Sequence, residues 1–193
     1  MVKKSLLDLN VALSQATIEA ERRTSAEVAA VVLQASDAYQ GHLFLYGLVL
    51  GSTIDILLWA GKIVAGFPFL FGIQVAAIAA VSLIPPLRDL CLQLIPKRVR
   101  HHHAARRAFE EYLFLSRHVP QERAIVLFYV SLAEKYVHIL HSRAVPAKIS
   151  DDIWESIVSK FTGAVKTGGL SAASIEAIGQ IAAVLAHHFP ESD

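Results

Sequence analysis

The sequence has very little cysteine and little charge. Its single cysteine, Cys91, cannot form an intrachain disulfide, which excludes a small secreted scaffold held together by disulfides. Charged residues make up 18% of the 193 residues, against about 25% in an average soluble domain. The 18 basic and 17 acidic side chains nearly cancel, so net charge does not indicate a nucleic-acid partner. The 54% apolar content excludes a disordered chain.

Complete catalytic motifs are also missing. There is no G-x-S-x-G, Walker loop, H-E-x-x-H or cysteine–histidine arrangement. Glu27, Glu122 and Glu134 stand at the ends of predicted strands and are weak catalytic candidates, because carboxylates at such positions are more often solvated turn or cap residues. His138 and His141 are expected on opposite faces of one strand, since side chains alternate along a strand. The residues themselves therefore predict no metal site.

Long apolar segments are what the sequence has in excess. Between Leu43 and Ile84 only two residues carry a formal charge, Asp55 and Lys62. A break containing glycine and proline divides this stretch into 43–60 and 67–84. As helices, the two segments would each be about 27 Å long, close to the thickness of a bilayer core. We expect a two-helix transmembrane hairpin over residues 43–84. The alternative is a helical hairpin buried in a soluble core.

Basic residues follow the second apolar segment. The run from Lys97 to Arg107 contains three consecutive histidines but no aromatic residue that could stack on bases, so we expect it to contact anionic lipid headgroups and not nucleic acid. Residues 85–104 are predicted to be an interfacial and basic linker. The positive-inside rule places both polar arms in the cytoplasm. The predicted membrane-surface residues are Lys97, Arg98, Arg100, Arg106 and Arg107.

Two polar side chains within the apolar segments are expected to meet. Asp55 and Gln74 lie at similar distances from the break, on helices that would run antiparallel. An ionisable side chain inside a membrane is costly, at about 2.5–3.5 kcal/mol near the centre, and it usually finds a partner. We therefore predict that Asp55 faces Gln74 or extends toward Lys62 at the interface.

The two polar arms are predicted to form one α/β domain that the hairpin interrupts. Residues 1–42 carry a helix and a first strand at 27–35. Residues 105–193 carry the remainder, including strands at 124–132 and 136–141 and two final helices. One strand cannot form a sheet alone, so the first strand is expected to join the other two.

Several segments resemble the TPM-domain family. Ile18–Val28 (IEAERRTSAEV) is similar to the stretch that leads from the first helix of that family into its first strand. Ala124–Arg143 (AIVLFYVSLAEKYVHILHSR) resembles its central strand, turn and next strand. The endings around Asp152–Trp154, Lys166–Leu170 and His188–Pro190 resemble a membrane-anchored bacterial subgroup that carries an internal transmembrane hairpin and would lie in the bacterial inner membrane.

This resemblance implies a fold and two functions. The fold is a TPM-like α/β domain, with a small mixed sheet flanked by helices and interrupted by the hairpin. Many family members have an acidic, glycine-rich segment after the second strand, where this chain has His141–Val145 (HSRAV). We therefore expect a binding or assembly module that faces the cytoplasm, with the bilayer and a membrane protein as partners. The alternative is a metal-dependent phosphatase at the membrane surface, with Ca²⁺ or Mg²⁺ implied by the resemblance alone.

Overall fold

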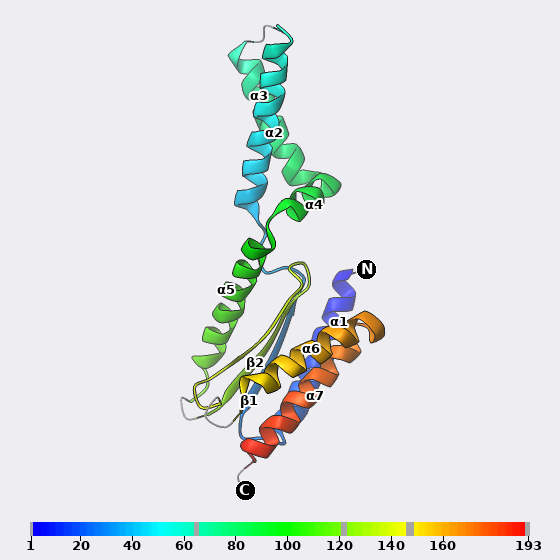
Figure 1. Cartoon of the computed structure of the whole chain (residues 1–193), viewed down its shortest axis with the longest axis vertical. Helices are drawn as coiled ribbons and strands as arrows, with labels where there is room; N and C mark the ends of the chain where they lie inside the picture. Colours follow the sequence, from blue (N-terminus) through cyan, green and yellow to red (C-terminus); the bar gives the residue numbers. More distant parts are fainter. Residues whose placement is uncertain (1, 64–65, 121–122, 146–148, 192–193) are drawn as a thin grey trace. The chain divides into compact units, whose positions relative to one another are not determined.

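The computed structural model describes residues 2–63, 66–120, 123–145 and 149–191. Within these residues the chain forms seven helices and three strands (Figure 1). In chain order they are α1 (Val2–Glu21), β1 (Glu27–Leu33), α2 (Gln40–Ala60), α3 (Phe67–Leu83), α4 (Pro85–Leu94), α5 (Lys97–Ser116), β2 (Ile125–Ser131), β3 (Tyr136–His141), α6 (Asp151–Gly168) and α7 (Leu170–His188).

The contacts divide the chain into two compact units. The first, which we call the sheet unit, consists of residues 1–36 and 101–193. The second, the hairpin unit, consists of residues 37–100. Because the first unit contains both ends of the chain, it is assembled from two segments that are remote in the sequence.

The sheet unit is built on a mixed sheet in the order β1-β2-β3. β1 pairs with β2 in parallel, with Glu27 opposite Ile125 and Leu33 opposite Ser131. β3 pairs with the other edge of β2 and runs antiparallel to it. Every residue of β2 is buried, as expected for a central strand covered on both faces. The predicted pairing of the N-terminal strand with the two later strands is confirmed.

A parallel pair of strands requires a long crossover connection between them. Here the connection contains the whole hairpin unit and returns through α5, which covers one face of the sheet (Figure 1). The inner face of α5 consists of Ala104, Ala108 and Tyr112, with both alanines fully buried. The apolar segment can therefore be inserted without interrupting any strand.

The main core lies on the other face of the sheet, beneath α1, α6 and α7. Phe128 at the centre of β2 packs edge-on against Phe161 of α6, with ring centroids 5.2 Å apart. α6 starts at a capping serine: the hydroxyl of Ser150 accepts a hydrogen bond from the N–H of Asp152 (3.4 Å). The sheet unit thus has a helix–sheet–helix layering.

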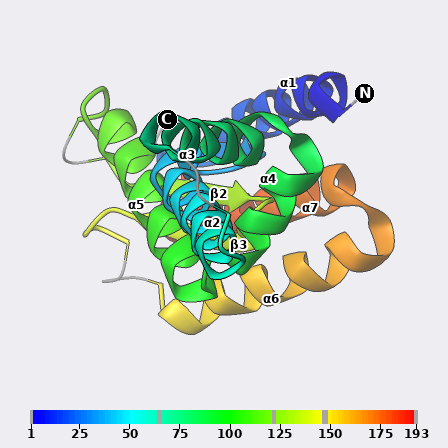
Figure 2. The same cartoon turned by 90° about the horizontal axis from the view of Figure 1, so that it is seen from above.

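In the hairpin unit, α2 and α3 pack side by side along their length (Figure 1). α4 continues from α3 after a bend of 87°, which Figures 1 and 2 show. Two consecutive prolines, Pro85 and Pro86, occupy the first positions of α4, where proline is compatible with a helix start but cannot continue the preceding one. The end of the second apolar segment is therefore a sharp turn.

The helices that are long and apolar enough to cross a membrane differ from the predicted pair. Among the described residues α2 and α7 have this length and composition, whereas the 17-residue α3 does so only together with α4, as a bent pair. α7 contributes buried residues such as Ile178, Ile181 and Leu185 to the core of the sheet unit. The apolar side chains on this face of α7 therefore pack within the sheet unit.

The segment predicted as an interfacial and basic linker, residues 85–104, is helical. It forms α4 and the first two turns of α5. The start of α5 has only a weak helical pattern in the sequence, because its buried face consists of small residues, Ala104 and Ala108, within a run of basic residues.

The two helices of the hairpin approach each other at Gly47 and Gly51, a G-x-x-x-G pair on α2. A Cβ atom at Gly47 would lie 2.6 Å from the Cα of Ile78 on α3. A Cβ atom at Gly51 would lie 2.5 Å from the Oε1 of Gln74. Small residues at this spacing let helix backbones approach closely, and this is typical of helices packed within a bilayer.

Substituting Gly47 tests this close approach. We expect Gly47→Ala to destabilise the hairpin, since overpacking costs about 1–3 kcal/mol. Gly72→Ala is the matched control: it also lies mid-helix, and a Cβ atom added there would meet nothing within 4 Å. Thermal unfolding in mild detergent, followed by circular dichroism, should give a lower midpoint for Gly47→Ala alone. Equal midpoints for the two variants would contradict this packing.

Candidate functional site

The predicted catalytic carboxylates do not come together. β1 and β2 run parallel and in register, and Glu27 is the first residue of β1. Glu134 follows the last residue of β2 and therefore lies at the other end of the sheet. A strand of seven residues separates them by about 23 Å, at about 3.3 Å per residue. These two carboxylates cannot bind the same ion. Glu122 lies outside the described residues.

Glu27 belongs to a charged cluster at the start of the sheet. Its carboxylate lies 3.1 Å from Arg123 Nη1, and Arg123 Nε donates to the carbonyl of Ser25 (2.8 Å). Glu21, at the end of α1, accepts a hydrogen bond from the N–H of Val28 (3.3 Å). Burial raises the pKa of Glu21, and the nearby Glu27 raises it further. The cluster ties α1 and the segment before β2 to the first strand.

Glu134 is the centre of a buried polar network at the opposite end. Only 3% of the residue is exposed, so the expectation of a solvated turn residue is wrong. Both carboxylate oxygens accept from the N–H of Ser36 (3.2 Å each), and the hydroxyl of Ser131 donates to the same carboxylate. Ser36 in turn donates its hydroxyl to Ser131 Oγ (2.7 Å). Glu134 therefore fixes the point where the chain leaves β1.

The hydroxyl of Tyr129 extends this network. It lies 2.9 Å from Ser36 Oγ, whose own proton is directed to Ser131. Tyr129 is therefore the donor in this contact. Burial raises the pKa of Tyr129, which keeps the phenol protonated and able to donate. The network is satisfied internally and has the character of a structural anchor.

Removing the Glu134 carboxylate should destabilise the protein. In Glu134→Ala the part-buried N–H of Ser36 and the buried hydroxyl of Ser131 lose their acceptor. We therefore expect a loss of about 1–3 kcal/mol in the free energy of unfolding. Glu176→Ala, at an exposed position on α7, is the control. Denaturant unfolding of the purified protein measures both. A loss below about 0.5 kcal/mol for Glu134→Ala would contradict the anchoring role.

The basic run occupies the first half of α5. Arg106 pairs with Glu110 one turn later (3.0 Å), and Arg107 pairs with Glu111 (2.7 Å). Lys97 and Arg98 are exposed. Arg100 is partly buried, and its Nε has no hydrogen-bond partner in the described part of the chain. Of the five predicted membrane-surface residues, Lys97 and Arg98 therefore have their charge most available to a lipid headgroup.

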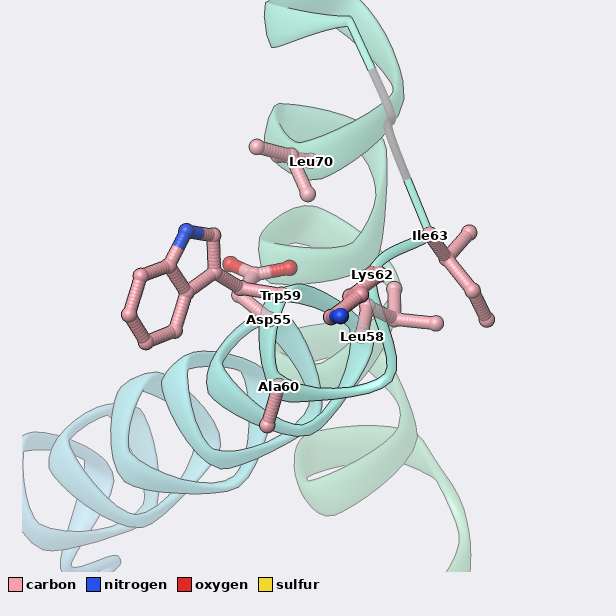
Figure 3. Close-up of a pocket in the computed structure, with 7 residues that line it drawn as sticks. All are labelled: Asp55, Leu58, Trp59, Ala60, Lys62, Ile63 and Leu70. Carbon is pink, nitrogen blue, oxygen red and sulfur yellow. The ribbon is translucent and has the colours of Figure 1, made fainter.

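The expected contact between Asp55 and Gln74 is present. Gln74 Nε2 donates to Asp55 Oδ2 and to Ser52 Oγ, both at 3.1 Å. The other oxygens of this pair, Asp55 Oδ1 and Gln74 Oε1, are buried and find no hydrogen-bond partner among the described residues. The predicted alternative was an approach of Asp55 to Lys62; both side chains line the same cavity, but no ion pair joins them among the described residues (Figure 3).

Asp55 and Lys62 instead line one cavity of about 600 Å³ near the end of α2. Figure 3 shows the Asp55 carboxylate between the side chains of Trp59 and Leu70. The remaining lining side chains are aliphatic. Among the described residues that line this cavity, only Asp55 and Lys62 are titratable.

A second cavity, of about 520 Å³, lies between β3 and α6. His138 and His141 are both among its lining residues, while their rings stack on different neighbours, His138 on Tyr136 and His141 on Trp154. The ring of His141 stacks on Trp154 of α6 (centroids 6.0 Å apart), and its Nε2 lies 3.6 Å from Asp151. Burial lowers the pKa of His138, and the neighbouring His141 lowers it further.

Trp154 is the residue here whose role the sequence does not reveal. The residue is 4% exposed, yet its indole Nε1 has no hydrogen-bond partner among the described residues, and neither has His141 Nδ1. A tryptophan in the first turn of a helix that follows a histidine-containing edge strand is the sequence signal for this site.

Comparisons with known proteins give a fold and no function. No family model matches the sequence, and no curated protein matches it. The structure is similar to the NMR structure of the BA42 protein from the psychrophilic bacterium Bizionia argentinensis, with a TM-score of 0.55. The two chains are 15% identical, and the match covers 96% of this chain and 84% of the other. At this identity the similarity supports the mixed α/β fold alone.

Proposed function

We propose that this protein is a membrane-tethered α/β module. The α2–α3 hairpin anchors it in a bilayer, and the sheet unit lies on the cytoplasmic side, where it binds or helps to assemble other membrane components. The observation that carries this proposal is the apolar surface of the hairpin, which the rest of the hairpin unit leaves uncovered.

The large apolar side chains of the hairpin are exposed all round. Leu57 is 65% exposed on α2, and Phe67 and Leu83, at opposite ends of α3, are 79% and 78% exposed. Burying one such side chain is worth about 1.5–3 kcal/mol, so leaving this surface in water would be very unfavourable. A lipid environment removes that cost. The apolar α7 does not compete as the anchor, because its buried face belongs to the core of the sheet unit.

The ends of the hairpin fit the boundaries of a membrane. Trp59 (81% exposed) and Lys62 lie at the turn between the helices, and such side chains are typical of the interface between headgroups and hydrocarbon. At the other end α4 turns by 87° from α3. With α3 along the membrane normal, α4 would lie in the plane of the interface, as amphipathic helices do.

Charge supports the cytoplasmic orientation. The connection between α2 and α3 has one basic residue, Lys62, whereas Arg88, Lys97, Arg98 and Arg100 follow α3 within a short distance. Positive charges near a span favour the cytoplasmic side. Each basic residue near an anionic surface contributes about 1 kcal/mol of attraction.

A binding or assembly role agrees with the site geometry better than catalysis does. Glu27 and Glu134 lie at opposite ends of the sheet, and each is engaged in contacts that hold the fold together. We retain the resemblance to the membrane-anchored TPM-domain subgroup as part of this proposal. The phosphatase alternative gains no support from the placement of its candidate carboxylates.

The topology can be tested in intact cells. A tag fused after Asp193 should be protected from external protease, and a tag inserted at Gly66 should be cleaved. Detergent lysis should make both tags accessible. Cleavage of the C-terminal tag without lysis would contradict the cytoplasmic orientation, and release of the protein into the soluble fraction at high pH would contradict membrane anchoring.

A further inference from the structure

β3 is an edge strand with an open side. It pairs with β2 only, in the described part of the chain. Directly after it, Ser142 donates its N–H to the carbonyl of Ile125 (2.9 Å). Hydrogen-bonded pairs alternate along an antiparallel ladder, so the outward-facing backbone groups belong to the residues one position out of phase with Ser142. These are Val137, Ile139 and His141.

No loop or side-chain hydrogen bond reaches these outward groups within the residues that the structure describes. The same three residues line the cavity between β3 and α6. An open strand edge therefore runs along a cavity of about 520 Å³. Exposed edges of this kind are sites where an extended chain can add a further strand.

Trp154, which lines the cavity, carries a donor that lacks an acceptor. Trp154 Nε1 is buried and has no partner in the described ranges, although an unmade hydrogen bond of a buried polar group is costly. His141 Nδ1 is likewise buried and has no hydrogen-bond partner among the described residues. Ile139 and Val158 supply apolar walls. These features fit a ligand that brings a main-chain carbonyl and an apolar side chain together.

The charge around the cavity favours a basic ligand. Asp151 and Glu155 are the two carboxylates among its described lining residues, and both are exposed. Neither lysine nor arginine is among those lining residues. The other described titratable residues that line it are His138 and His141, and the lowered pKa of His138 keeps that ring neutral at neutral pH.

We propose that this edge is a docking site for an extended, basic peptide segment of a partner protein. The segment adds as a strand to Val137, Ile139 and His141, places an apolar side chain in the cavity, and presents a carbonyl to Trp154 Nε1. Its lysine or arginine side chains lie near Asp151 and Glu155. This assignment rests on the proposed binding function and names the chemistry of the partner.

Peptide binding by the full-length protein in nonionic detergent tests this site. The probe is a fluorescein-labelled peptide of three Lys-Val repeats, measured by fluorescence anisotropy. Trp154→Phe should weaken its binding about tenfold while leaving the unfolding midpoint unchanged or higher, because the indole N–H has no partner in the described chain to lose. Glu155→Gln should weaken binding about threefold at low salt. Asp152→Asn, which lines a different cavity, is the matched control.

Two further probes separate strand addition from charge alone. A peptide with the same side chains but N-methylated at every amide has no N–H on either edge, so it cannot form the strand ladder and should not bind. A Glu-Val repeat should bind more weakly than the Lys-Val repeat. The proposal is overturned if Lys-Val does not bind at about 1 mM, if the methylated peptide binds equally, or if Trp154→Phe has no effect. None of these outcomes affects the membrane anchor, which protease accessibility tests separately.

Discussion

β1 and β2 run parallel and in register, and this pairing joins the two ends of the chain into one sheet. A parallel pair cannot be closed by a tight turn, so the intervening chain must leave the sheet and return. That requirement places the hairpin unit and α5 in a single crossover. It also places Glu27 and Glu134 at opposite ends of the sheet, so the pairing that organises the fold also separates the two carboxylates.

The buried network around Glu134 stabilises the end of β1, where the chain leaves the sheet. The chain leaves the sheet at Ser36, where a long insertion could pull the end of β1 away from β2. A carboxylate that accepts twice from one backbone N–H holds this point, with Ser131 and Tyr129 completing the contacts. Hydrogen bonds to a buried charged group are stronger than neutral ones. The Glu134 network therefore holds the end of β1 in place at the point where the inserted segment begins.

The two helices of the hairpin, α2 and α3, are held together by contacts of a different kind. Two apolar helices can associate through close backbone approach and through polar contacts between them. Gly47 and Gly51 provide the first, and the contact of Gln74 with Ser52 and Asp55 provides the second. Gly51 and Gln74 are in direct contact, so the absence of a side chain on one helix makes room for the polar side chain of the other.

The sequence by itself determined the elements that depend on local pattern. Alternation and apolar runs identified the three strands and the two hairpin helices, and the symmetric placement of Asp55 and Gln74 about the turn predicted their contact. Tertiary structure alone decided which polar residues are buried. Glu134 is enclosed because Ser36 packs over it, and Trp154 meets His141 only because α6 crosses β3. Such contacts join residues remote in the chain, and a single sequence carries no local signal of them.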